Sequence, residues 1–178
     1  MINSIRYTLF FLCSALLFAQ GEVKLPMGFH ASFVQTITND QKKKIIYRGK
    51  IDFSSPENFK WHYTSPTKKE VCTDGTELLV VDHDLEQVSY YVMDGELDLP
   101  AILKESKLHR KSVYIATHRG KNYTIQVNKR GELSRIAYMD NLDNTVLIVF
   151  SNMKYRKKRF STNRMKCHTP KNYDYIGG

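Results

Sequence analysis

The hydrophobic positions of this chain recur mainly at every second residue, which is typical of β-strands that bury one face. The clearest stretch runs from Lys44 to Ser54, where one face carries Ile45, Tyr47, Gly49, Ile51 and Phe53. The same alternation, bounded by turn signals, predicts further strands at residues 59–63, 70–73, 78–81, 87–92, 113–117, 123–127, 133–138, 146–150 and 166–169. Roughly ten short strands with tight turns predict a mainly β fold with an antiparallel sheet, arranged as a sandwich or a barrel.

Two segments show helical spacing instead. In the first, Phe29, Phe33 and Ile37 recur every four residues and would share one face of a helix. Pro26 precedes them at a place that a first helical turn tolerates. We therefore predict a short helix over residues 29–37.

The second helical segment covers residues 98–105 and interrupts the run of strands. Asp98 is a capping residue, and Pro100 suits a first helical turn. Leu99, Ile102 and Leu103 follow the i, i+3, i+4 spacing of an amphipathic helix. We expect this short helix to pack its apolar side on the sheet.

The N-terminus has the features of a secretory signal peptide. Arg6 precedes the mostly apolar run 7–18, and Ala19 follows as a small residue suited to cleavage. The run is shorter than the about 20 residues of a membrane span. Cys13 follows three bulky residues, so acylation at that cysteine is not expected. Residues 1–19 are therefore predicted to be a leader, and residues 20–178 a single exported domain.

The predicted export changes how the basic charge of the chain is interpreted. The chain has 178 residues, with 27 Lys+Arg against 18 Asp+Glu and a net charge of +9. Cleavage after Ala19 would remove Arg6 and leave 26 − 18 = +8. Such a basic balance often indicates nucleic-acid binding, but an exported protein does not meet chromosomal DNA or RNA. We expect no nucleic-acid partner.

The sequence shows no motif typical of catalysis, a cofactor or a metal. It has no nucleophile elbow, phosphate-binding loop or metal-ligating histidine spacing. The cluster Asp82-His83-Asp84 is interpreted as a turn, because consecutive residues do not converge on one reacting atom. Cys72 and Cys167 are either a disulfide or two separate buried thiols. We expect no enzyme activity, cofactor or metal.

The strongest charge feature is the basic run Lys154–Arg159. It is typical of a solvated loop or of an edge strand whose charges oppose pairing. A functional alternative is docking on anionic phospholipid headgroups or on an acidic protein.

Aromatic residues make up 12% of the chain, and many fall on the predicted apolar faces. The members that the alternation places there are Phe33, Tyr47, Phe53, Phe59, Trp61, Tyr63 and Tyr90. A small sandwich core does not need so many large rings. They would suit a curved sheet whose concave face holds an apolar ligand.

Three stretches of this sequence resemble the LolA/LolB family of lipoprotein carriers and receptors. They are residues 29–35, residues 49–75 with the Phe59-x-Trp61 pair, and residues 84–88 followed by the 100–103 segment. Because no acylatable N-terminal cysteine is found, the chain is similar to the soluble carriers of the family. The resemblance implies an incomplete antiparallel β-barrel, closed by a helical lid over a hydrophobic cavity.

The resemblance also implies a function in the periplasm. A soluble carrier would move acylated lipoproteins from the inner to the outer membrane, and we expect it to be a monomer. Its partners would be an ATP-driven inner-membrane release complex and an outer-membrane lipoprotein receptor. The residues expected to bind the lipid are Phe33, Ile51, Phe53, Phe59, Trp61, Val71, Ile102 and Leu103.

One departure from the family concerns the lid. The carriers usually have Arg before the proline that is Pro56 here, and that Arg is thought to latch the lid, whereas this chain has Ser55. Arg48 and Lys60 are candidates to replace it. Two other functions stay open from the sequence: a carrier of another amphiphile, and an exported hydrolase.

Overall fold

A computed structural model describes residues 23, 25–92 and 98–177 of the chain. These residues form one sheet of twelve strands. The strands are β1 (Gly28–Thr38), β2 (Lys44–Ser54), β3 (Asn58–Ser65), β4 (Lys69–Thr73), β5 (Glu77–Asp82), β6 (Gln87–Val92), β7 (Lys107–Arg110), β8 (Val113–His118), β9 (Lys121–Val127), β10 (Leu133–Met139), β11 (Thr145–Arg156) and β12 (Asp174–Gly177). The two helices are α1 (Leu99–Glu105) and α2 (Thr162–Met165). The predicted leader, residues 1–19, lies outside the described residues.

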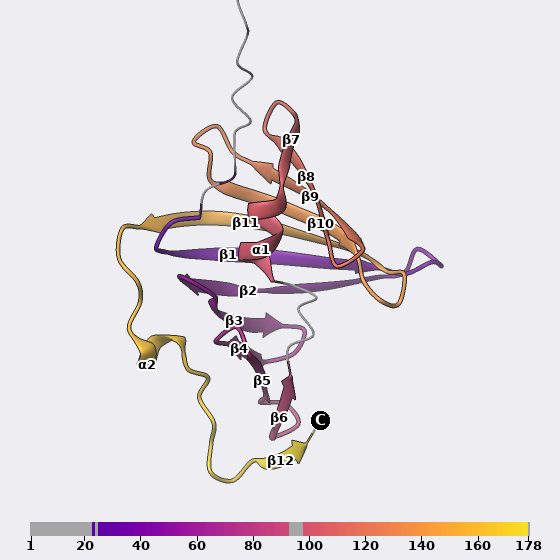
Figure 1. Cartoon of the computed structure of the whole chain (residues 1–178). Coiled ribbons are helices and arrows are strands. Elements are labelled where there is room, and N and C mark those ends of the chain that lie inside the picture. Colours follow the sequence, from indigo (N-terminus) through magenta and orange to yellow (C-terminus); the bar gives the residue numbers. More distant parts are fainter. Residues whose placement is uncertain (1–22, 24, 93–97, 178) are drawn as a thin grey trace, which may run out of the picture.

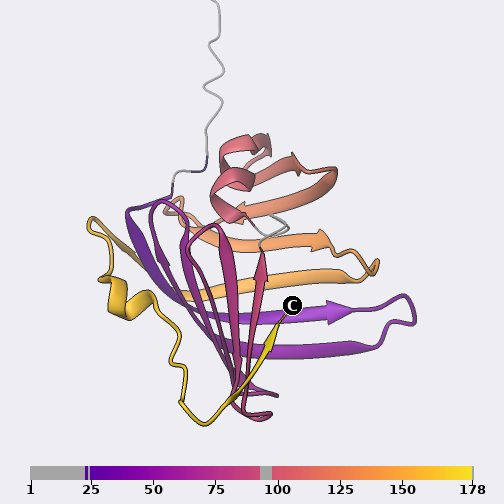
Figure 2. The same ribbon diagram turned by 60° about the horizontal axis from the view of Figure 1, so that its bottom comes forward.

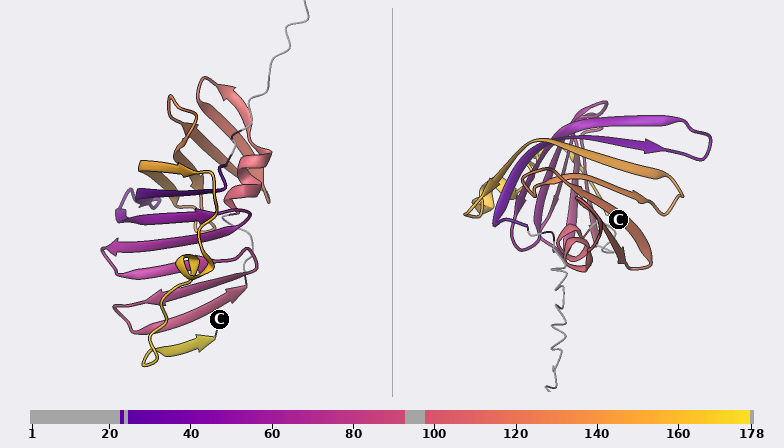
Figure 3. Two further views of the ribbon diagram at one scale, coloured as in Figure 1. Left: turned by 90° about the vertical axis from the view of Figure 1, so that its left-hand side faces the viewer. Right: turned by 90° about the horizontal axis from the view of Figure 1, so that it is seen from above.

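The sheet is open and strongly curved. Its strand order is β12-β6-β5-β4-β3-β2-β1-β11-β10-β9-β8-β7, as Figure 1 shows. Every neighbouring pair is antiparallel except β12 and β6, which run parallel. The sheet bends around α1, which lies on its hollow side (Figure 3, right). The predicted mainly β fold, an incomplete antiparallel barrel, is confirmed.

The predicted helix over residues 29–37 is wrong, because this segment is β1. In a strand, every second residue points to the same face, so residues four positions apart also share a face. Phe29, Phe33 and Ile37 would therefore share one face in a helix or in a strand. Ala31, which lies between the first two, is fully buried as well. β1 pairs along its length with β2 and β11, and these two neighbours select the strand.

Helix α1 forms as the sequence predicts. The Asp98 carboxylate accepts a hydrogen bond from the Ala101 backbone N–H at 3.0 Å and so caps the first turn. Leu99, Ile102 and Leu103 are 0–1% exposed. The helix therefore buries its apolar side against the hollow face of the sheet.

The face of the sheet that carries α1 is called the inner face below, and the opposite one the outer face. The register aligns Phe29 with Phe53 and Phe33 with Gly49, so aromatic residues of β1 and β2 share the inner face. Gly49 is required there, since a Cβ would lie 2.8 Å from the Phe33 ring and closer still to the His62 carbonyl oxygen. The main apolar core lies between this inner face and α1.

The segment 157–177, called the C-terminal strap, runs over the outer face of β2 to β6 (Figures 2 and 3). Cys167 forms a disulfide with Cys72 of β4, which decides between the two alternatives for these cysteines. Residues 166–169 therefore belong to the strap, and the strand predicted there is wrong. The strap ends in β12, which pairs with β6 and which the hydrophobic pattern does not predict.

Candidate functional site

The eight residues predicted to bind lipid lie together in one apolar cluster. Seven of them are between 0% and 8% exposed, and Val71 is partly buried. The sheet supplies six of them and α1 supplies two, as the following set shows: Phe33, Ile51, Phe53, Phe59, Trp61 and Val71, with Ile102 and Leu103. The cluster is thus a layer of side chains between the inner face and a helix.

Strand register explains why the rings of the cluster meet. Opposite residues of neighbouring strands point to the same face, and the register aligns Phe53 with Phe59 and Trp61 with Val71. The ring centroids of Phe53 and Phe59 are 4.8 Å apart. Those of Phe33 and Trp61 are 4.9 Å apart in an edge-on arrangement. The rings form a continuous apolar floor on the inner face.

Two further aromatic residues belong to this floor and were not among the predicted set. Phe29 lies 5.2 Å from Phe53, and Phe150 lies 6.4 Å from Trp61, measured between ring centroids. The register of β1 with β2 brings Phe29 opposite Phe53, and a helix over residues 29–37 does not predict this pairing. Phe150 lies in a predicted strand, but only the pairing of β11 with β1 brings it next to Phe33.

A groove opens beside α1 at the edge of the cluster. It encloses about 380 Å³, and its lining includes Phe53 from the floor and Leu103 from α1. Ser55 and Pro56 line its rim together with the N-terminal segment. The Ser55 backbone N–H donates to the Met27 carbonyl at 2.9 Å, so the turn after β2 is attached to that segment. The groove gives a path from the solvent to the buried rings.

A second part of the inner face is only partly covered. Val71 pairs with Val80 of β5, and both side chains are partly exposed. Leu78 is also partly exposed, and Tyr91 on β6 is 48% exposed. These side chains extend the apolar floor from Trp61 toward β6.

Neither of the two residues named from the sequence as a replacement for the latch lies near α1. Lys60 lies on the outer face, where its ammonium group is 3.1 Å from the Glu70 carboxylate. Arg48 is also exposed on the outer face, opposite Val34. The sheet separates both from α1, so neither is placed to latch it.

A polar contact does join α1 to the sheet. Glu105, the last residue of α1, lies with its two carboxylate oxygens 3.0 and 3.1 Å from Nδ1 of His118 on β8. His118 is 9% exposed, and its Nε2 is buried without a hydrogen-bond partner in the described part of the chain. Glu105 and His118 lie 13 positions apart in sequence. No sequence motif predicts the contact between Glu105 and His118, because it depends on how α1 lies over β8.

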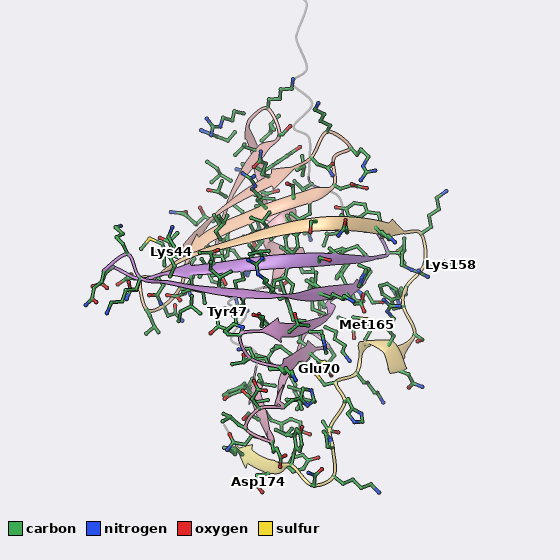
Figure 4. The ribbon with its side chains drawn as sticks, turned by 180° about the vertical axis from the view of Figure 1, so that it is seen from behind. Lys44, Tyr47, Glu70, Lys158, Met165 and Asp174 are labelled. Carbon is green, nitrogen blue, oxygen red and sulfur yellow. A yellow bond between two sulfur atoms is a disulfide. The ribbon has the colours of Figure 1, made fainter. Side chains whose placement is uncertain are left out.

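The outer face carries an ionic network that attaches the strap. Arg164 donates two hydrogen bonds of 3.0 Å to Asp52, and the His168 backbone N–H donates to Glu70 at 2.8 Å. Burial opposes ionisation of Glu70, but the hydrogen bonds from His168, Lys60 and His62 outweigh it and hold the pKa of that carboxyl below its ordinary value. Asp52 has its pKa lowered in the same way by Arg164 and His30. Figure 4 shows Glu70 and Met165 on this side.

The described residues offer no catalytic cluster at Asp82-His83-Asp84. Asp82 accepts hydrogen bonds of 3.0 Å from the backbone N–H groups of Asp84 and Leu85, which fixes the predicted turn. Among the described residues, the one group with metal-ligand geometry is Glu70 with Cys72 and Cys167, and the two sulfurs of this group are joined in the disulfide. In the described ranges, no helix is long and apolar enough to cross a membrane.

Comparison with known proteins identifies the family. A family model described as outer membrane lipoprotein carrier protein LolA matches residues 26–115, which is half of the chain and includes α1 and all eight predicted site residues. The chain belongs to the LolA family. The match extends from the N-terminal segment before β1 into β8, so it covers α1 and most of the residues of the floor and the groove.

Two relatives agree with membership of the LolA family, and one solved structure agrees with the fold. An outer-membrane lipoprotein carrier protein of Wolinella succinogenes is 32% identical over 125 residues, which is 70% of this chain and 73% of the relative. One of Campylobacter jejuni is 30% identical over 148 residues, 83% of this chain and 85% of the relative. The structure of a LolA superfamily protein from Nitrosomonas europaea matches with a TM-score of 0.51 and 13% identity, covering 82% of this chain and 93% of that one. The last comparison supports the fold alone.

Proposed function

We propose that this protein is a periplasmic carrier that moves lipoproteins from the inner to the outer membrane. The supporting observation is the apolar cluster of aromatic rings beneath α1, in a chain of the LolA family. The acyl chains of the cargo would lie on the floor formed by Phe33, Phe59 and Trp61. The protein acts by binding rather than by catalysis and needs no cofactor.

The physical need for such a carrier comes from the cost of exposing acyl chains to water. Each buried CH₂ contributes about 0.8 kcal/mol, so three chains of roughly 16 carbons would cost on the order of 35 kcal/mol if they crossed an aqueous gap unprotected. Rings and aliphatic side chains accommodate flexible acyl chains without fixing one conformation. An apolar surface of this kind shelters the acyl chains and does not distinguish between the proteins attached to them.

We infer that the buried state of the cluster keeps the affinity for cargo moderate. The floor residues are already covered by Leu99, Ile102 and Leu103 of α1, which are 0–1% exposed. Burial of each of these side chains contributes about 1.5–3 kcal/mol, or about 5–9 kcal/mol for the three. Cargo must displace these contacts, so its net affinity is lower by that amount. A carrier that has to release its cargo benefits from such competition.

The partners follow from the direction of transport. We propose that an ATP-driven complex of the inner membrane loads the carrier and that a lipoprotein receptor at the outer membrane unloads it. The groove beside α1 is the proposed entry, because it joins the solvent to Phe53 and Leu103. Loading would widen it as α1 moves away from the floor.

The molecules that co-purify with the protein test this proposal. The full chain is expressed with its leader, and the periplasmic protein is purified without detergent and examined by native mass spectrometry. We expect bound masses that correspond to acylated lipoproteins. A bound free lipid would instead support a carrier of another amphiphile, and turnover of a fluorogenic ester by the unliganded protein would support a hydrolase.

A matched pair of variants connects the bound mass to the floor. Phe59→Ser removes a ring that is 4% exposed, whereas Ser151→Ala changes an exposed residue of β11 on the outer face. We expect the bound mass to decline with Phe59→Ser and to persist with Ser151→Ala. Equal occupancy of the two folded variants would contradict the assignment of the floor.

A further inference from the structure

The outer face of four central strands combines exposed cations with exposed aliphatic side chains. Register places residues of β2, β1, β11 and β10 in rows across this face. One row runs from Arg48 through Val34 and Val149 to Arg135. The adjacent row, nearer the β1–β2 turn, runs from Ile46 through Thr36 and Leu147 to Ala137. Cationic and apolar rows therefore lie side by side.

The apolar part of this face is accessible to solvent. Ile46 is 45% exposed, Leu147 is 37% exposed, and Met139 at the end of β10 is 54% exposed. Leu142, in the turn between β10 and β11, is 81% exposed. These aliphatic residues gather on one end of the outer face, with Thr36 between Ile46 and Leu147, and a gathering of exposed apolar residues on a folded domain indicates a surface that contacts another partner.

The cations of the face are exposed, and four of them have no carboxylate partner in the described part of the chain. They are Arg48, Lys50, Arg135 and Lys154. The two carboxylates that lie nearby on the outer face, Asp52 and Glu70, already pair with the strap and with Lys60. The face thus keeps an excess of positive charge.

The turns at the end of this face contribute no net charge. Lys42, Lys43 and Lys44 at the β1–β2 turn are matched by Asp40, Asp140 and Asp143 of the two neighbouring turns, so that the six charges sum to 3 − 3 = 0. Asp140 is held by the backbone N–H groups of Leu142 and Asn144. The surplus therefore resides on the strands rather than at their tips, and Figure 4 shows this side with Lys44 labelled.

The basic run Lys154–Arg159 adjoins this face. Its first three residues end β11 and pair with β1 on one side, whereas the pairing of β11 with β10 covers only Thr145 to Val149. Its last three residues begin the strap, and all the cations of the run are exposed. The run therefore extends the positive surface toward the strap.

We propose that this face, made of Ile46, Arg48, Arg135, Met139 and Leu147 with the cations around them, docks the carrier on the anionic headgroup surface of a lipid bilayer. Aliphatic side chains would enter the interfacial region while Lys and Arg contact lipid phosphates. The proposal goes beyond the carrier function, because the face lies on the opposite side of the sheet from the cargo floor.

The chemistry of the face fits a membrane better than an acidic protein. Protein interfaces are depleted of Lys, whereas Lys50 and Lys154 are exposed on this face. The four cations lie on three strands, β2, β11 and β10, which with β1 between them span about 14 Å. They do not converge on a single point, as binding to one carboxylate or phosphate group would require.

Vesicle binding tests the proposal. The mature protein is mixed with vesicles of phosphatidylcholine alone or with about one third phosphatidylglycerol, and bound protein is measured by sedimentation. Each surface cation contributes about fivefold to binding of an anionic membrane. We expect binding only to the anionic vesicles, about 30-fold weaker binding by Arg48→Gln/Arg135→Gln, and weaker binding at high salt.

Two further variants distinguish this face from general charge. Lys107→Gln/Lys111→Gln removes the same number of exposed cations near β7, at the far end of the sheet, and should bind as the unaltered protein does. Ile46→Ser/Leu147→Ser should bind more weakly while its charge is unchanged. No binding of the unaltered protein to anionic vesicles would overturn the proposal, and so would equal losses in both charge variants. Because all variants keep the inner face, cargo content measured in parallel separates this result from a failure of the carrier function.

Discussion

Substitution of one lid residue provides a sensitive test of the competition between α1 and cargo. Ile102 is 0% exposed and belongs to the cluster that also contains Phe59 and Trp61. Ile102→Ala removes buried methyl and methylene groups from α1, and such truncations cost about 2–5 kcal/mol in packed cores. With the low end of that range, the closed lid loses about 2 kcal/mol relative to the open one.

The weaker packing of α1 in Ile102→Ala should appear as tighter cargo binding. If cargo displaces the lid, a lid weakened by about 2 kcal/mol raises cargo affinity by up to about 30-fold. Phe59→Ala removes a floor ring that the cargo itself would contact, so its effect should have the opposite sign. The two substitutions therefore move affinity in opposite directions, although both remove apolar side chains from the same cluster.

The assay is a titration with a fluorescent triacylated lipopeptide, followed by anisotropy, with transfer to an acceptor membrane measured separately. We expect Ile102→Ala to bind more tightly and to release cargo more slowly. Lys107→Ala, which changes an exposed residue just after α1, serves as the control. Weaker binding by Ile102→Ala, comparable with that of Phe59→Ala, would refute the idea that the lid and the cargo exclude each other.

Three further results are expected. Glu105→Gln should loosen the end of α1, because it weakens the hydrogen bond to His118. We expect faster hydrogen exchange of the α1 amides and unchanged exchange of the β1 amides. Equal exchange rates of the α1 amides in the variant and the unaltered protein would argue against a latch. Cys167→Ser should lower the free energy of unfolding by about 4–5 kcal/mol, because the disulfide closes a loop with a sequence separation of 95; urea unfolding with and without reductant measures this, and an unchanged midpoint would contradict it. The pKa of Glu70 is lowered from the ordinary 4.5, so its ionised form stabilises the fold above that pH, and this stability is lost as the pH falls through the lowered pKa. Glu70→Gln should therefore show a shallower loss of stability below about pH 4.5, and identical pH profiles would show that the strap network does not depend on this carboxylate.

The sequence predicts the sheet well because most strands bury only one face. Alternation of apolar and polar residues then marks each strand directly, as at Ile51 and Phe53. The pattern does not predict β1 as a strand, because a spacing of four residues fits both a helix and a strand. Pairing with β2 and β11 decides between the two. All four residues of β12 are exposed and show no apolar alternation, so local sequence does not identify it.

The candidate site shows the same division. The eight predicted residues share one cluster because alternation and the 100–103 helix define which side chains are apolar and buried. Contacts that join distant segments needed the three-dimensional arrangement. The bond between Glu105 and His118 and the disulfide of Cys72 with Cys167 both depend on where α1 and the strap lie over the sheet. The sequence does not show that Arg48 and Lys60, the two candidates for a contact with α1, lie on the face opposite to it.

The central claim, that acyl chains occupy the floor beneath α1, can be measured with the intrinsic fluorescence of the protein. Trp61 is the single tryptophan of the chain, and it lies in the floor at 8% exposure. Titration with a lipopeptide whose acyl chains carry bromine atoms, which quench indole fluorescence at short range, reports contact directly. The account predicts saturable quenching of Trp61 by the brominated lipopeptide but not by its unbrominated form. Binding of the lipopeptide with undiminished Trp61 fluorescence would contradict it.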